Sequence, residues 1–189
     1  FLARNPDGTL YRDSQGRALM FCEERPSGQH RGVELWRSGV DTLDDWTLVG
    51  RVLDRGEPGS WDSADRTSPT VVSDGDGTLV MLFEGRSDVN LDDAQVGFAW
   101  STDEGETWTA APDPIIGVDA SGSWREGGVV PDEIMRIGDV WVLLCHGKEG
   151  GSWSRIGRFA TTDPPAEWGP GSFVELPGNP ISTTTNTVM

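Results

Sequence analysis

Two acidic residues stand in matching sequence contexts and could serve as general acids or bases. Asp65 and Arg66 follow Trp61. Glu126 similarly follows Trp124, which lies 63 residues after Trp61. A carboxylate held close to a reacting group can donate or accept a proton. In the structural interpretation, the same acids form ion pairs and the tryptophans pack. Because the context is repeated, the elements of the repeat decide where these residues lie.

The composition describes an acidic, turn-rich β protein. The chain of 189 residues has 25 glycines, 12 prolines, 9 tryptophans and 35% hydrophobic residues, which is typical of a globular protein. Its net charge of -16 disfavours nucleic acids and anionic membrane surfaces as partners. No apolar run approaches the roughly 20 residues of a membrane helix. No signal peptide is visible in the sequence, which begins with Phe1. The sequence does not determine the compartment, and a secreted or extracellular location is slightly favoured.

Few residues could bind a metal. Cys22 and Cys145 lie inside hydrophobic runs, which predicts buried free thiols rather than a disulfide or a metal site. His30 and His146 are too few for a His-rich centre. Residues 74–77, Asp-Gly-Asp-Gly, could hold calcium or simply form a tight turn, and they lack the Lys of a phosphate loop. We therefore expect no cofactor, and a structural calcium ion stays an open alternative.

Residues 101–108 predict a tight hairpin turn. Asp103 can accept hydrogen bonds from backbone amides ahead of it, and Gly105 can adopt a positive φ without steric cost. The closing tryptophan can fold back onto the core. Weaker copies end at Trp46 and Trp168. The recurrence marks these acids as turn residues rather than a site.

Short apolar segments recur with a period of about 60 residues. They are residues 18–25, 79–86 and 140–147, in which Met20, Met81 and Val142 are 61 residues apart. Each is expected to be a buried strand. A Pro-led segment, expected to be another strand, precedes each: residues 6–11, 69–73 and 131–136. Four antiparallel strands in each unit are typical of a propeller blade.

We therefore predict an all-β fold, a β-propeller with four-stranded antiparallel blades of about 60 residues. One domain, residues 1–189, would contain blades at about 1–55, 56–117 and 118–178, and residues 179–189 would start a fourth. Propeller rings usually close with four to eight blades. About three are present, so further residues of the protein or another chain would complete the ring, which we expect to have five blades.

The repeat resembles two groups of carbohydrate-active propellers. Residues 101–108 are similar to the Asp-box hairpin of sialidases, which also occurs in non-enzymatic propellers. The wider pattern is more similar to the five-bladed propellers of the invertase, levansucrase and arabinanase clan. In that clan an inner strand near a proline precedes an apolar strand and a Ser-x-Asp…Trp hairpin. Residues 35–46 and 97–103 carry the similarity to that hairpin.

This resemblance implies a glycosidase that acts on an oligosaccharide or polysaccharide through two carboxylates. One is the general acid and the other the nucleophile or base, and their separation determines retention or inversion. A third acid tunes the pKa of the acid catalyst. The positions where the clan has these acids here hold Asn5, Ser68 and Val129, none of which is a carboxylate. The nearest acids are the predicted catalytic residues: Asp7, Asp65, Glu126 and Asp132.

The resemblance also suggests residues that would bind sugar. Arg66 would bind hydroxyl groups, and Trp61 and Trp124 would stack on sugar rings. The structural alternatives are an ion pair between blades for Asp65 and Arg66, and packing within the blades for the two tryptophans.

The third unit adds two candidates. Asp132 and Glu133 should lie on opposite faces of a strand, and we expect Asp132 to face the central channel. His146 would contact the sugar or transfer a proton, or would be structural. Glu84 ends the apolar strand of the second unit, and the 61-residue spacing gives Cys145 the same place in the third.

Three functions stay open: a glycoside hydrolase, a carbohydrate-binding or structural propeller without the acids, and a sialidase-like enzyme. The last would need Tyr11, the only tyrosine of the chain, as its nucleophile. Two predicted acids within about 10 Å in the channel would favour hydrolysis. A channel without acids near Asn5, Ser68 and Val129 would favour binding. In each case the expected partner is a carbohydrate.

Overall fold

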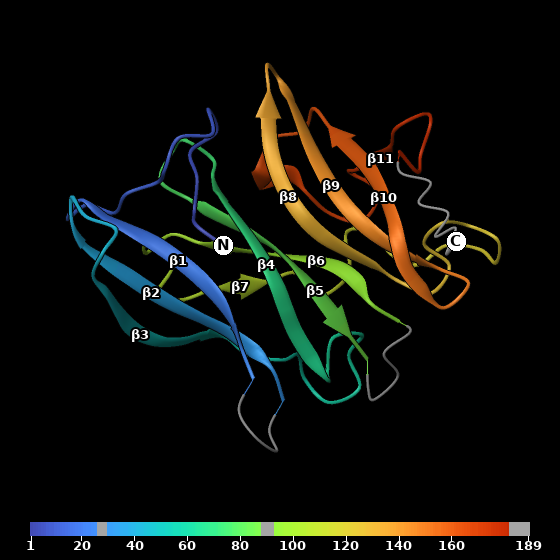
Figure 1. Cartoon of the computed structure of the whole chain (residues 1–189), viewed down its shortest axis with the longest axis horizontal. Coiled ribbons are helices and arrows are strands. Elements are labelled where there is room, and N and C mark those ends of the chain that lie inside the picture. The colour runs from blue at the N-terminus through green and yellow to red at the C-terminus, as the bar shows by residue number, and fades with distance from the viewer. Residues whose placement is uncertain (26–29, 88–92, 182–189) are drawn as a thin grey trace, which may run out of the picture.

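The computed structural model describes residues 1–25, 30–87 and 93–181, which form three antiparallel sheets (Figure 1). Sheet one contains β1 (Arg17–Glu24), β2 (Gly32–Val40) and β3 (Trp46–Leu53). Sheet two contains β4 (Asp65–Ser73), β5 (Leu79–Arg86), β6 (Gln95–Ser101) and β7 (Thr109–Ala110). Sheet three contains β8 (Val129–Ile137), β9 (Val140–Glu149), β10 (Ser152–Thr161) and β11 (Val174–Glu175), with a 3-10 turn, η1 (Pro165–Glu167), before β11. The predicted all-β propeller with about three blades is confirmed, and we call the sheets blades 1, 2 and 3.

No helix within these ranges is long and apolar enough to cross a membrane. Most of the segment expected to begin a fourth blade, residues 179–189, lies outside the described residues.

The innermost segments of the blades lie next to one another. In blade 1 this segment is residues 2–4, and Arg4 forms a parallel bridge with Val72 of β4. β8 adjoins β4, since the Ile134 amide lies 3.4 Å from Oγ1 of Thr70. Figure 1 shows β4 and β8 running in the same general direction. The starts of these strands therefore gather at one end of the molecule and their ends at the other.

The prediction that residues 6–11 form a strand is wrong. Residues 6–9 are a turn, in which the Thr9 amide donates a hydrogen bond of 2.9 Å to Oδ1 of Asp7. The inner segment of blade 1 comes before this turn, where Leu2 pairs with β1. Pro, Asp and Gly in succession favour a turn more strongly than the spacing to the next strand favours an extended segment.

Two apolar clusters fill the spaces between blades. The cluster between blades 1 and 2 includes odd-numbered residues of β1 and β5: Leu19, Phe21, Leu79, Met81 and Phe83. The cluster between blades 2 and 3 includes even-numbered residues of β5 and odd-numbered residues of β9: Val80, Leu82, Trp141, Leu143 and Cys145. Since side chains alternate along a strand, β5 is buried on both faces.

This alternation corrects the predicted alignment of the third unit. Cys145 faces blade 2, as Phe83 faces blade 1, so these two residues correspond and lie 62 positions apart. Glu84 consequently corresponds to His146, not to Cys145. Aligning the apolar segments by sequence missed this one-residue shift. Such a shift exchanges the two faces of a strand, but the segment still consists of apolar residues.

The predicted hairpin turn between β6 and β7 is present. The Thr107 amide donates to Oδ1 of Asp103 at 2.9 Å, and Gly105 has a φ of 83°. The indole nitrogen of Trp108 donates to the Gly105 carbonyl at 2.9 Å. Its ring meets Phe21 of blade 1 edge to face, with 5.6 Å between centroids. The turn of blade 2 thus packs against blade 1.

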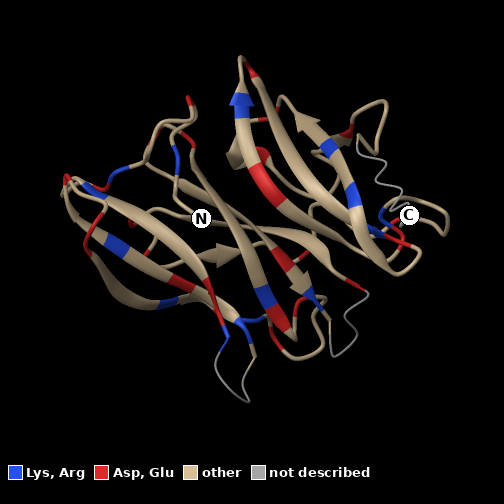
Figure 2. Ribbon diagram, in the orientation of Figure 1, with Lys and Arg blue, Asp and Glu red and all other residues tan. Residues whose placement is uncertain are grey.

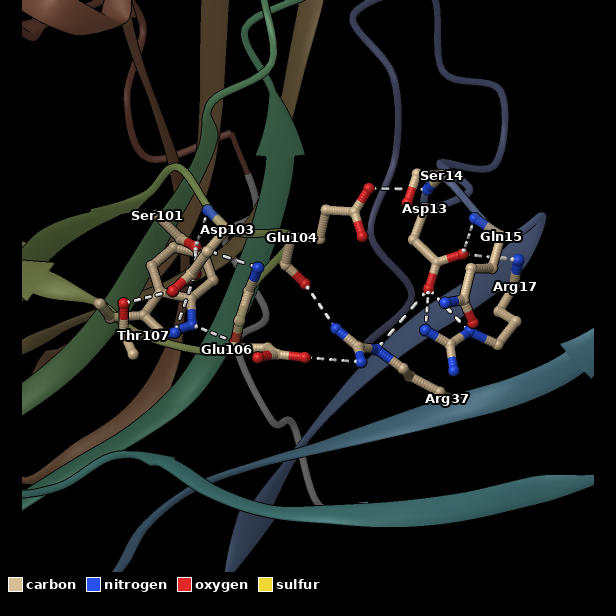
Figure 3. Close-up of polar contacts among 12 residues, drawn as sticks. Asp13, Ser14, Gln15, Arg17, Arg37, Ser101, Asp103, Glu104, Glu106 and Thr107 are labelled. Atoms are coloured by element: carbon tan, nitrogen blue, oxygen red, sulfur yellow. Dashed lines mark hydrogen bonds and ion pairs between the residues drawn. The ribbon is translucent and has the colours of Figure 1, made fainter.

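Charged residues beside this turn join blades 1 and 2 (Figure 3). The side chain of Asp13 is fully buried, 2.8 Å from Nη2 of Arg17 and 3.6 Å from Nε of Arg37. Arg37 also forms an ion pair of 2.8 Å with Glu106. Glu104 accepts a hydrogen bond of 2.7 Å from the backbone of blade 1. We call Asp13, Arg17, Arg37, Glu104 and Glu106 the clasp.

Candidate functional site

Asp132 and His146 form a half-exposed acid–histidine contact on β8 and β9 of blade 3. Asp132 lies at a bulge in β8, where the pairing with β9 shifts between Pro131 and Glu133. Its Oδ1 is 2.7 Å from Nδ1 of His146 on β9. The two side chains are 40% and 38% exposed. Trp153 of β10 meets the imidazole edge to face at 5.4 Å. Acidic residues in the middle of β8 are visible in Figure 2.

This contact determines what the imidazole can do. An ionised Asp132 accepts a hydrogen bond only when Nδ1 of His146 carries a proton, which leaves Nε2 as the basic nitrogen of a neutral ring. The half-exposed carboxylate can also accept hydrogen bonds from hydroxyl groups of a ligand. The pair can therefore bind a polyol and move a proton.

Blade 2 has a buried arrangement at the corresponding place. β4 also has a bulge, between Thr67 and Thr70, and Ser68 within it has a φ of 49°, a left-handed conformation that is costly for a residue other than glycine. Ser68 Oγ donates to Glu84 at 2.8 Å. Glu84 is buried and forms an ion pair with Arg86. At this position blade 2 carries a buried network, whereas blade 3 carries the exposed Asp132–His146 pair.

Asp65 begins β4 and is bound to blade 1. Its Oδ1 accepts a hydrogen bond of 2.8 Å from the Arg31 amide. Its Oδ2 accepts bonds of 2.9 and 2.7 Å from the Arg31 guanidinium. Burial would raise the pKa of Asp65, but the hydrogen bonds and charge of Arg31 outweigh burial and lower it. Arg31 therefore engages both carboxylate oxygens, Oδ2 in an ion pair between blades and Oδ1 through its backbone amide.

Arg66 and Trp61 contact residues of blade 2 and of the end of blade 1, where Arg66 donates to the Asp54 carbonyl at 3.1 Å. The Arg66 guanidinium lies 2.7 Å from Asp62 and 5.4 Å from the Phe83 ring centroid. Trp61 stacks on the same ring with centroids 6.0 Å apart, and its indole nitrogen donates to the Pro112 carbonyl at 3.0 Å. These are structural contacts at the start of β4 and in the loop before it.

Trp124 and Glu126 occupy the corresponding loop of blade 3. Trp124 is buried, and its indole nitrogen donates to Glu175 at 2.6 Å. Glu126 accepts hydrogen bonds from the Gly122 amide at 2.6 Å and the Gly150 amide at 3.0 Å. The Gly122 bond, followed by the Gly150 bond, lowers the pKa of Glu126. The glutamate thus ties its own loop to the turn after β9.

Asp7 lies at the opposite end of the inner segments from Asp65. The hydroxyl of Thr9 and then its amide lower the pKa of this exposed acid by hydrogen bonding. Asp7, Arg4 and Glu133 line a pocket of about 380 Å³, in which Arg4 Nε is 3.7 Å from Glu133. Glu133, rather than Asp132, therefore reaches the inner segment of blade 1.

Of the eight predicted site residues, the structure joins Asp132 to His146. No contact of the described residues links two of the four predicted acids: Asp7, Asp65, Glu126 and Asp132. Tyr11, considered as a nucleophile, packs against the cluster between blades 1 and 2.

The turn at residues 74–77, for which calcium binding or a tight turn were the alternatives, forms its own hydrogen bonds. Oδ1 of Asp74 accepts bonds of 2.8 Å from the Asp76 amide and 3.0 Å from the Thr78 amide. Within residues 1–25, 30–87 and 93–181, no three His, Cys, Asp or Glu side chains are grouped to hold a metal ion.

Several solved structures that are similar to this chain are glycoside hydrolases. One is Zg3597, a family 117 glycoside hydrolase from the marine bacterium Zobellia galactanivorans, with a TM-score of 0.70 and 16% identity over 87% of this chain and 53% of that one. A thermostable family-43 glycoside hydrolase gives a TM-score of 0.67 and 14% identity over 92% and 54%. Sucrose-6-phosphate hydrolase from Lactobacillus gasseri gives 0.64 and 18% over 88% and 33%. The chain has the fold of the β-propeller glycoside hydrolases.

The similarity to these glycoside hydrolases is clear in the structure but weak in the amino-acid sequence. No protein-family model matches it, and no curated protein matches it significantly. The chain spans about half or less of the length of these propeller glycoside hydrolases, since it covers 53%, 54% and 33% of them. The identities of 14–18% establish a shared fold. The chemistry of this chain must be argued from its own residues.

Proposed function

We propose that this chain is the part of a propeller glycoside hydrolase that contributes Asp132 and His146 to a carbohydrate site. The substrate would be an oligosaccharide or polysaccharide, cleaved by paired-carboxylate chemistry. Asp132 would act as one carboxylate, and His146 would hold it in place and bind a sugar hydroxyl. The contact of 2.7 Å between these residues, both half-exposed beside an inner-strand bulge, carries the proposal.

Hydrolysis needs a second carboxylate roughly 5–9.5 Å from the first. Asp65 is a poor candidate because Arg31 occupies both of its oxygens. Asp7 and Glu126 are bound within their own turns. Because the chain covers 53% of the family 117 hydrolase and 54% of the family-43 hydrolase, we assign the second carboxylate to a part of the ring outside these three blades.

A carbohydrate-binding propeller without catalysis is the second candidate. It is favoured by the residues at the positions where the related clan has its acids. Asn5 donates hydrogen bonds to Thr9 and to the Leu10 carbonyl, Ser68 binds Glu84, and Val129 is buried. Asp132 and His146 would then bind sugar hydroxyls only.

The test compares Asp132→Asn with wild type in the full-length protein on aryl-glycosides and natural oligosaccharides. The substitution preserves shape but removes the charge, and we expect kcat to fall about 10²–10⁴-fold. Asp139→Asn is the control, because that turn acid is fully exposed and pairs with Arg136 at 3.5 Å. Equal turnover by Asp132→Asn and wild type contradicts the catalytic role. If wild type binds but does not cleave sugars, and the substitution weakens binding, the second candidate holds.

A further inference from the structure

A pocket between blades 2 and 3 lies apart from the Asp132–His146 pair. Its volume is about 310 Å³, at the lower end of the ~300–1,000 Å³ usual for small-molecule sites. The turn after β4 and the end of β6 form one wall, and η1 with Trp168 forms the other. Val80, Phe98 and Trp168 of its lining also belong to the apolar cluster between blades 2 and 3.

The floor of the pocket is aromatic. Phe98 and Trp100 lie two residues apart on β6 and so point to the same face, with ring centroids 5.7 Å apart. Trp100 is 38% exposed, whereas Phe98 and Trp168 are 6% and 5% exposed. Trp168 packs edge to face on Trp141 at 5.6 Å. Trp100 therefore provides the open ring surface of the pocket.

Polar groups line the pocket beside these rings. Asp74, Thr78 and Thr102 provide a carboxylate and two hydroxyl groups. Asp74 is held in place by the hydrogen bonds that its Oδ1 accepts from its own turn. The lining contains one acid and no basic side chain, which disfavours an anionic ligand.

We propose that this pocket binds one ring of a neutral saccharide, with the C–H face of the sugar on Trp100. A sugar ring has an apolar face and a hydroxyl edge, which match an aromatic floor beside acceptor groups. A quaternary ammonium ion fits less well, because it needs several exposed aromatic faces around it. The saccharide assignment rests on the proposed function, whereas the pocket itself does not.

This site lies far from Asp65, the residue at the other end of β4. Asp74 follows the last residue of that strand, and nine residues of strand span on the order of 25–30 Å. The pocket lining does not include Asp132 or His146, so a long polysaccharide could contact this pocket in addition to the proposed site. The role of the pocket would be to retain a long polysaccharide. Such a ligand would bind more tightly than a monosaccharide because it contacts two sites.

The experiment titrates the full-length protein with neutral mono- and oligosaccharides of hexoses and pentoses, following tryptophan fluorescence and heat of binding. We expect Trp100→Ala to weaken one binding event about tenfold or more. Trp100→Phe, which keeps an aromatic ring, should retain most of the affinity, and thermal melting of both variants reports on folding. Asp132→Asn should leave this event unchanged. The chain has 9 tryptophans, so the fluorescence change is assigned by its loss in the variants.

Three results overturn the proposal: no saccharide of the panel binds, folded Trp100→Ala binds as tightly as wild type, or tetramethylammonium binds here while sugars do not. Failure of the glycosidase function gives a different result. In that case turnover is absent or insensitive to Asp132→Asn, while the saccharide binding that depends on Trp100 persists.

Discussion

Oδ1 of Asp132 and Nδ1 of His146 are 2.7 Å apart at the place in blade 3 where blade 2 has Ser68 and Glu84. Both pairs join an inner-strand bulge to the apolar strand beside it. In blade 2 the acid is on the apolar strand and buried, whereas in blade 3 it is on the bulge and half-exposed. The same backbone feature therefore supports a structural network in one blade and a candidate site in the next.

Replacing His146 by Ala should reduce activity more than stability. Its side chain is 38% exposed, so we expect a loss of less than about 1 kcal/mol in the free energy of unfolding. Turnover, or sugar affinity if the protein does not cleave, should fall about tenfold or more, because Asp132 loses its partner. Parallel thermal melts and assays check this. If unfolding of the variant explains its whole loss of activity, His146 has a structural role instead.

Gly85→Ala should destabilise the protein through Trp61. An added Cβ would lie 2.3 Å from the indole ring, closer than atoms can approach. Overpacking of this kind costs roughly 1–3 kcal/mol. Gly169→Ala is the matched control, since nothing lies within 4 Å of its added Cβ. Urea denaturation measures both, and equal midpoints would contradict the packing of Trp61 on β5.

The clasp should depend on its buried acid. Asp13→Asn removes the buried carboxylate that Arg17 and Arg37 share and leaves Arg37 with the more exposed Glu106, and we expect a loss of about 3 kcal/mol. Glu106→Gln also removes a charge beside Arg37, but Glu106 is 54% exposed, so its loss should stay below about 1 kcal/mol. Similar losses from the two variants would argue against the clasp.

The Asp65–Arg31 pair should make stability sensitive to acid. The folded-state pKa of Asp65 is lowered, so the pair stabilises the protein above the unfolded pKa near 3.9. That contribution disappears as the pH falls through the folded pKa. Asp65→Asn should therefore destabilise the protein at pH 7 by about 2 kcal/mol and approach wild type as the pH falls through the lowered pKa. Thermal melts from pH 2 to 7 measure this, and a constant difference would contradict it.

The two free cysteines should differ in reactivity. Burial is the main cause of a pKa of Cys145 well above the usual value, and the charge of Asp132 adds to it. Because the thiolate is the reactive form, iodoacetamide should modify only the partly exposed Cys22 in the native protein at pH 8. Mass spectrometry of peptides, with a urea-unfolded control, reads out both sites. Native labelling of Cys145 would show that the space between blades 2 and 3 opens.

The sequence by itself determined the propeller. The recurring apolar strands and the hairpins that end at Trp46, Trp108 and Trp168 depend on local turn chemistry and on burial, and both are visible in residue types. The turn around Asp103 formed as predicted for that reason.

Only the tertiary structure decided which acid is open. The short turn at residues 138–139 would place Asp132 opposite Cys145 in unbroken pairing, but a one-residue bulge shifts the register, and Asp132 meets His146 instead. A bulge changes which side chains meet without leaving a clear mark in residue types. The engagement of Asp65 by Arg31 joins two blades through residues 34 positions apart, which no local pattern encodes. The fold thus follows from periodicity, and the site follows from register and packing.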